Sequence, residues 1–203
     1  MIIYFVRHGK DDDAYRGGWS NLQITEEGKK QVKKLADYLE KNKDKFIIRK
    51  IISSDLERAR QTTEIINKKL NVPVEYTCRL REMNNGDIAG MLNTEVEKRY
   101  PGLYYNTLDI DEKYPGGESP IEFYNRIVND FEDIVKENKN TGNFMVITHS
   151  GVINIIYRYI NKMEWSNKIK SIKIANASIY SLRIEKNKRE FELENFKRYL
   201  ESE

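Results

Sequence analysis

The strongest constraint on the fold is an apolar run near the start of the chain that ends in three residues of a very different kind. Residues 2–6 are β-branched or aromatic, which is typical of a strand buried on both faces. Arg7, His8 and Gly9 follow this run directly. Because ligands of open α/β sheets bind at the carboxyl ends of the strands, the tripeptide indicates a ligand site. A histidine that is merely buried at a strand end is the alternative interpretation of these three residues taken alone.

Composition limits the class of protein. The 203 residues suffice for one domain with a substantial core. The net charge of +3 mildly favours anionic ligands, and the basic residues are too dispersed for a nucleic-acid surface. Cys78 is the only cysteine, so an internal disulfide is excluded and we expect an inert, buried thiol. No apolar run approaches the length of a membrane span and a strand begins at Ile2, so we expect a cytoplasmic protein with no membrane or nucleic-acid partner.

The rest of the chain alternates strand patterns with helix patterns, which predicts an α/β domain. Helices are expected from residue 25 to about 42, after 55, after 119 and after 151, and strands within 46–54, 72–76, 143–148, 171–184 and 189–196, the last two antiparallel. Asp55 is a candidate N-cap for the second helix, and Ser119 with Glu122 forms a capping box for the third. We expect only a charged terminus after Phe196.

Two stretches lack a regular pattern. Residues 11–21 form a polar loop whose three aspartates lack the alternation of a calcium loop, so a solvated loop is expected. Residues 91–118 combine tyrosines with glycines and prolines, and a lid over the site and a packed connector are equally favoured there. We therefore expect residues 1–203 to form one domain with a lid-like insertion at about 91–118.

The chain contains two histidines, and both follow a buried apolar strand. His149 comes directly after the strand expected at 143–148, and like His8 it is followed by a glycine within two residues. If the two strands are parallel neighbours, both imidazoles lie at the same edge of the sheet. Arg7 and Arg58 are expected to join them there, and guanidinium groups match phosphate oxygens bidentately. The pattern predicts a site for a tetrahedral anion, at which the N-terminus of the following helix also points.

These residues resemble the histidine phosphatase superfamily, in the branch that includes cofactor-dependent phosphoglycerate mutases and many small phosphatases. The matching pieces occur in the family's order over roughly residues 1–185. They lie at 7–9, 24–28, 53–62, 81–82 ahead of Gly86 and Gly90, 116–119, 148–151 and 176–178. The resemblance implies a three-layer α/β/α sandwich with a mostly parallel central sheet.

The resemblance also implies an activity, the hydrolysis of a small phosphorylated metabolite through a phosphohistidine. His8 looks like the nucleophile, and Glu82 looks like the acid that protonates the leaving oxygen and then the base that activates water. The residues that would bind or stabilise the phosphoryl group are Arg7, Gly9, Arg58, His149 and Ser150. No metal or other cofactor is implied, because arginines supply the positive charge.

Several alternatives stay open. A phosphoglycerate mutase shares all these residues, but its larger shielding insertion is missing here, which favours hydrolysis. A regulatory module that only binds phosphate is less favoured, because the whole catalytic set is present. The family's pattern is broken at Lys10, Ala14 and 87–89, so the substrate is not specified. A homodimer and a substrate contact from Lys10 or Arg16 are also left open.

Overall fold

A computed structural model describes residues 1–186 and 188–200, and at its centre is a six-stranded sheet with the order β3-β2-β4-β1-β5-β6. The strands are β1 (Ile2–Arg7), β2 (Ile51–Ser54), β3 (Val74–Thr77), β4 (Phe144–Thr148), β5 (Ile179–Glu185) and β6 (Lys188–Phe196). The pairs β1–β4, β4–β2 and β2–β3 are parallel, whereas β5 and β6 add antiparallel strands beside β1. The expected sheet, mostly parallel and closed by antiparallel strands, is confirmed.

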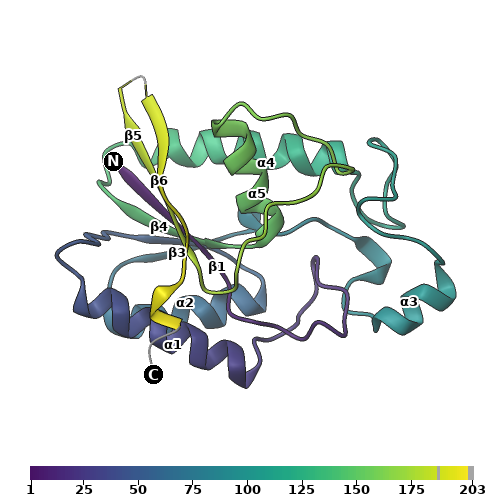
Figure 1. Ribbon diagram of the computed structural model, residues 1–203, viewed down its shortest axis with the longest axis horizontal. Helices are drawn as coiled ribbons and strands as arrows, with labels where there is room; N and C mark the ends of the chain where they lie inside the picture. Colours follow the sequence, from purple (N-terminus) through teal and green to yellow (C-terminus); the bar gives the residue numbers. More distant parts are fainter. Residues whose placement is uncertain (187, 201–203) are drawn as a thin grey trace.

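Helices cover both faces of this sheet (Figure 1). The helices α1 (Glu26–Lys41) and α2 (Glu57–Leu70) lie on one face, and α4 (Pro120–Glu137) and α5 (Ser150–Ile160) lie on the other. The short helix α3 (Asn93–Arg99) stands apart from the sheet, among the loops. The three-layer α/β/α arrangement is therefore confirmed. None of the helices that the structure describes combines the length and the apolar character needed to cross a membrane.

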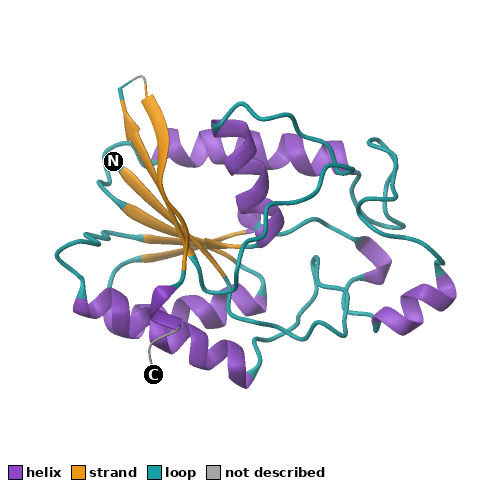
Figure 2. Ribbon diagram, in the orientation of Figure 1, coloured by secondary structure: helices purple, strands orange, loops and turns teal. Residues whose placement is uncertain are grey.

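The first strand lies in the middle of the sheet because both of its faces are apolar. Ile3 and Phe5 belong to the core under α4 and α5, and Tyr4 and Val6 belong to the core under α1. All four side chains are at most 4% exposed. Burying one such side chain stabilises the fold by about 1.5–3 kcal/mol, so the position of β1 is strongly determined. Figure 2 shows the long loops gathered at the side of the sheet where the parallel strands end.

Of the two helix caps predicted from the sequence, one is present and one is not. The Thr25 hydroxyl accepts a hydrogen bond from Gly28 N at 3.1 Å, and Ser119 with Glu122 forms the expected capping box. Asp55 does not cap α2: Leu56 occupies the N-cap position without a side-chain bond. The Asp55 carboxylate instead binds the Arg81 guanidinium, since a charged partner competes successfully for a short acidic side chain.

Two smaller expectations need correction. Cys78 is exposed, because it opens the 3-10 helix η1 (Cys78–Leu80) at the sheet edge after β3. The C-terminal part is more than a charged tail, since the 3-10 helix η3 (Arg198–Leu200) buries Tyr199 to 5% exposure against the core of α1. Residues 201–203 lie outside the described part of the chain.

The segment at 91–118 is packed into the molecule. Val96, Leu108 and Tyr114 are at most 6% exposed and join the same core cluster as α4 and α5. Its Tyr105 and Tyr114 also line a cavity next to the candidate site. The prediction of a single domain with a lid at this segment stays a prediction.

The N-terminus of α1 packs directly on the backbone that follows His8. A Cβ atom on Gly28 would lie 2.3 Å from the Lys10 carbonyl oxygen, and one on Gly9 would lie 2.7 Å from a methyl group of Val32. Thr25 N also donates to the Lys10 carbonyl at 2.8 Å. Two glycines are therefore required where the turn after β1 meets α1, and this contact fixes the position of the turn.

Replacing Gly28 with alanine should therefore destabilise the fold although alanine favours helices. The new methyl group cannot avoid the Lys10 backbone, and overpacking of this kind costs about 1–3 kcal/mol in the free energy of unfolding, as measured by urea denaturation. Gly17→Ala is the matched control, because a Cβ atom there would meet nothing within 4 Å. Equal stability of the two variants would contradict the packing described here.

Candidate active site

The parallel pairing of β1 and β4 brings the two histidines together. Arg7 is in register with Thr148, and His8 N donates to the Thr148 carbonyl at 3.0 Å. The imidazole rings of His8 and His149 consequently lie 5.1 Å apart between centroids. Both side chains are at most 4% exposed. The juxtaposition expected from the sequence is thus present.

Arg58 reaches the same place from the first turn of α2, and its guanidinium is only 2% exposed. Nη2 donates to the Gly18 carbonyl at 2.7 Å, and Nε lies 3.3 Å from His8 Nε2 and 3.5 Å from Asp11 Oδ2. Burial lowers the pKa of Arg58, and the negative charge of Asp11 opposes this change. The group remains a cation because its ordinary pKa is far above neutrality.

The hydrogen bonds of His8 define its tautomer. Nδ1 lies 2.8 Å from the Gly9 carbonyl, which can only accept, so Nδ1 carries the proton. Nε2 is then unprotonated, and its lone pair accepts a long hydrogen bond of 3.3 Å from Arg58 Nε. Burial, followed by the charges of Arg58 and Arg7, places the pKa of His8 well below its usual value. His8 is therefore a neutral imidazole with one fixed nitrogen and one nucleophilic nitrogen.

His149 is fixed through its other nitrogen. Nε2 lies 2.8 Å from the Ser54 hydroxyl, whose oxygen already accepts from Leu56 N at 3.3 Å. When the hydroxyl proton is donated to Nε2, Nδ1 of His149 becomes the protonated nitrogen. Nδ1 is buried and has no hydrogen-bond partner in the described part of the chain. Burial and then Arg58 hold the pKa of His149 well below its usual value, so this imidazole is also neutral.

Glu82 lies at the N-terminus of α5. Its carboxylate accepts hydrogen bonds from Gly151 N at 3.0 Å and from Met83 N at 3.1 Å. A Cβ atom on Gly151 would come within 2.2 Å of the carboxylate, so only glycine permits this close approach. These two backbone donors fix the orientation of the Glu82 carboxyl group at the start of α5.

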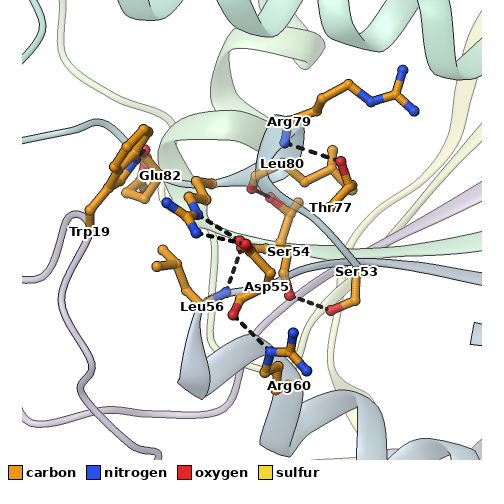
Figure 3. A network of polar contacts seen from close by, with 12 residues as sticks. Trp19, Ser53, Ser54, Asp55, Leu56, Arg60, Thr77, Arg79, Leu80 and Glu82 are labelled. Carbon is orange, nitrogen blue, oxygen red and sulfur yellow. Dashed lines mark hydrogen bonds and ion pairs between the residues drawn. The ribbon is translucent and has the colours of Figure 1, made fainter. Parts of the chain in front are cut away.

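The segment that carries Glu82 is held by polar contacts from three directions, and Figure 3 shows several of them. Asp55 binds Arg81 through two bonds of 2.6 and 2.7 Å. The Trp19 indole N–H donates to the Glu82 carbonyl at 2.6 Å. Thr148, one residue before His149, donates its hydroxyl to the Leu80 carbonyl at 2.8 Å. The acidic residue is thus anchored to the same strand end as the histidines.

Arg126 of α4 completes this anchoring, and sequence reasoning missed it. Its guanidinium donates to the carbonyls of Arg81 and Glu82 at 3.3 and 3.2 Å and binds the Glu118 carboxylate at 2.7 Å. In the sequence it is one basic residue on an amphipathic helix, so no local signal distinguishes it. Glu118, the ion-pair partner of Arg126, lies within residues 116–119, which match the family's pattern. Arg126 itself lies outside all the matching pieces.

A cavity of about 330 Å³ opens over these groups. The predicted residues that line it are Arg7, His8, Arg58, Glu82 and Ser150. His149 lies beside His8 behind this wall, and the Gly9 amide faces away, donating to the Thr62 hydroxyl at 3.1 Å. No group of three or more His, Cys, Asp or Glu side chains suited to hold a metal ion occurs within residues 1–186 and 188–200. The chemistry available is therefore that of guanidinium and imidazole groups around an anion.

The loop at 11–21 contributes more than a solvated surface. Asp11 pairs with Arg58 and is only 14% exposed, whereas Asp12 and Asp13 are exposed as expected. Arg16 lines the cavity, and its Nε atom is buried without a partner among the described residues. Lys10 is directed elsewhere, to the Glu27 carboxylate at 2.7 Å. Of the two cations left open by the sequence, only Arg16 faces the site.

Comparison with known proteins agrees with this geometry. A model of the histidine phosphatase superfamily (branch 1) matches residues 3–197. A broad-specificity phosphatase of Saccharomyces cerevisiae is 31% identical over 197 residues, covering 93% of this chain and 82% of the relative. Phosphoserine phosphatase 1 of Hydrogenobacter thermophilus is 28% identical over 191 residues, covering 92% of this chain and 88% of the relative. The alpha-ribazole phosphatase structure from Shigella flexneri shares the fold, with a TM-score of 0.83 at 21% identity and 97% coverage of both chains. Because the family match spans nearly the whole sequence, the chain belongs to the histidine phosphatase superfamily (branch 1).

Proposed function

We propose that this protein hydrolyses a small phosphomonoester through a phosphohistidine formed on His8. The observation that carries the proposal is the state of His8, a neutral imidazole with Nδ1 fixed by the Gly9 carbonyl and Nε2 directed at Arg58. A lone pair held in a cavity lined by Arg7 and Arg58 suits attack on a phosphoryl group. The names of the relatives, a broad-specificity phosphatase and a phosphoserine phosphatase, support the reaction class.

In the first step His8 Nε2 attacks phosphorus, the bond from phosphorus to the alcohol oxygen breaks, and the departing oxygen takes a proton from the Glu82 carboxyl group. Arg7 and Arg58, together with the unpartnered Nδ1 of His149, stabilise the charge on the three equatorial oxygens. In the second step water attacks phosphorus, Glu82 takes the water proton, and the bond to nitrogen breaks. The products are the free alcohol and inorganic phosphate.

In this proposal arginines supply the positive charge that a metal ion supplies in other phosphoryl transferases. Ser150 adds a neutral hydroxyl donor in the wall of the cavity. Metal independence, a cytoplasmic location and a homodimer are predictions that need their own measurements. Formation of an isomerised phosphoglycerate without phosphate release would favour the mutase alternative.

Replacing His8 with alanine should abolish the covalent intermediate. A ³²P-labelled phosphomonoester should label the wild-type protein with acid-sensitive radioactivity within one turnover, and the variant should stay unlabelled. Activity should fall on the order of 10⁴-fold or more, as when other nucleophiles are removed. Labelling should survive exhaustive chelation. A variant that keeps a tenth of the wild-type rate would refute the role of His8.

Replacing Glu82 with glutamine should reduce the rate in proportion to how poor the leaving group is. An alkyl oxygen needs a proton as it departs, whereas nitrophenolate does not. In single-turnover measurements the loss for an alkyl phosphate should exceed the loss for p-nitrophenyl phosphate by about 10²–10⁴-fold, the usual contribution of a general acid. Glu64→Gln is the matched control, because Glu64 is an exposed glutamate of α2 that lines neither the cavity nor its neighbourhood. Equal losses for both substrates in Glu82→Gln would exclude it as the acid.

Neither imidazole should titrate near pH 6.5 in the folded protein, because burial and the two arginines lower both pKa values. With only two histidines in the chain, their ring protons are readily followed by NMR from pH 8 to 5. In the unfolded chain both imidazoles bind a proton below about pH 6.5, whereas in the folded chain they do not. The two histidines therefore make the free energy of unfolding fall as the pH drops through that value. Arg58→Gln should raise the pKa of His8. A normal titration of both rings in the wild-type protein would contradict the neutral pair.

A further inference from the structure

A second cavity, of about 540 Å³, adjoins the first. Arg7, Glu82 and Ser150 line both cavities, so the two communicate at the proposed proton donor. The oxygen that leaves phosphorus must lie within reach of Glu82. The alcohol to which that oxygen belongs therefore extends into the second cavity.

The wall of this second cavity is mainly aromatic and apolar. Its rings come from three separate parts of the chain: Tyr105 and Tyr114 from the segment at 91–118, Phe123 from α4, and Trp165 from the loop after α5. Ile155 of α5 and Ile169 of the same loop add aliphatic surface. Walls of this kind favour ligands with apolar surface, and the volume is that of cavities that hold drug-sized molecules.

The charged groups of the wall are almost all engaged. Arg158 is 7% exposed and donates to Asn154 Oδ1 and to the carbonyls of Glu164 and Lys170. Arg7 donates to the Ile174 carbonyl at 2.7 Å. Glu82 is the only carboxylate that lines the cavity in the part of the chain that the structure describes, and Lys173 is an exposed cation at its rim. An ammonium group on the alcohol would therefore find no other counter-ion in this wall.

Among the residues that the structure describes, the unpartnered polar groups of this wall include two neutral donors, and Asn85 adds a neutral acceptor, its Oδ1 atom. The hydroxyl groups of Tyr105 and Tyr114 have no hydrogen-bond partner among residues 1–186 and 188–200. Burial raises the pKa of both, that of Tyr114 to about 12, so both hydroxyls keep their protons. They can therefore donate to hydroxyl, carbonyl or ring-nitrogen acceptors of an uncharged ligand.

We propose that the second cavity holds the alcohol part of the substrate, and that this protein prefers phosphomonoesters of bulky, uncharged alcohols with aromatic or apolar surface over phosphoamino acids. The inference rests on the proposed phosphatase function and adds the substrate class to it. A small alcohol would leave most of the apolar wall uncovered, and the ammonium group of a phosphoamino acid would lose its hydration without gaining a counter-ion other than Glu82, the proposed acid.

The test compares primary alkyl phosphates whose leaving oxygens are chemically similar, so that differences report binding of the alcohol. Ethyl phosphate, 4-phenylbutyl phosphate and phosphoserine are assayed by phosphate release, and kcat/KM is measured for each. We expect 4-phenylbutyl phosphate to exceed both others by about 100-fold or more, since each methylene in an apolar pocket contributes severalfold to tenfold or above.

A charged substitution in the wall then links this preference to the cavity. Ile169→Glu should reduce the ratio of kcat/KM between 4-phenylbutyl and ethyl phosphate by about 10-fold or more, because the new carboxylate must be desolvated against the phenyl ring. Ile47→Glu is the matched control, since Ile47 is 47% exposed and lies outside both cavities, and its ratio should equal that of the wild type. If the wild-type protein has nearly equal kcat/KM values for 4-phenylbutyl and ethyl phosphate, the inference is overturned, and no variant is needed for this conclusion.

The outcomes separate the two proposals. If ethyl phosphate and phosphoserine are hydrolysed as well as 4-phenylbutyl phosphate, the substrate class is wrong and the phosphatase function stands. If none of these esters, nor p-nitrophenyl phosphate, releases phosphate, the proposed function itself fails. A preserved preference in Ile169→Glu would show that the alcohol binds elsewhere.

Discussion

The burial of the Arg58 guanidinium is the interaction on which the site depends. A cation taken out of water is costly unless its donors are satisfied and its charge is paired. Here the Gly18 carbonyl, Ser20 and His8 accept hydrogen bonds from Arg58, and the Asp11 carboxylate lies 3.5 Å from its Nε. The same buried charge, acting over a short distance in a poorly polarisable environment, helps to keep His8 and His149 neutral. In the proposed reaction the same residue is an anion ligand, and its charge is, after burial itself, the main cause of the low pKa values of the two imidazoles. The loops that supply its acceptors are, for the same reason, part of the site.

Most of the fold was predictable because its central strands and helices have apolar side chains on one or both faces. A sheet between two layers of helices is the arrangement that buries all of these faces. β1 and β4 are apolar on both faces, which requires central positions with helices above and below. Parallel pairing of those strands then brings His8 and His149 together without further information. The capping box at Ser119 likewise depends on residues three positions apart, so local sequence contains all of it.

What the sequence could not reveal depends on contacts between distant residues. Asp55 is of a residue type that often caps helices, but its carboxylate accepts hydrogen bonds from Arg81, which lies 26 positions away in the sequence. Arg126 resembles any basic residue of an amphipathic helix until α4 is seen beside the segment that carries Glu82. Cys78 has a residue type that is usually buried, yet its place at the sheet edge exposes it. In each case the tertiary partner, and not the local pattern, decides the outcome.

The Asp11 carboxylate provides Arg58 with a counter-ion that belongs to the protein itself. In the proposed reaction the incoming phosphoryl group therefore displaces the Asp11 carboxylate from Arg58. Only the difference between the attraction of Arg58 to the phosphoryl group and its attraction to Asp11 contributes to substrate affinity. Added salt screens that difference less than it would screen the full attraction to a bare guanidinium. A tethered carboxylate also has a fixed effective concentration that dilution cannot lower. If the proposed reaction takes place, Asp11 competes with inorganic phosphate for the same cation after every turnover, which favours departure of the product over its retention.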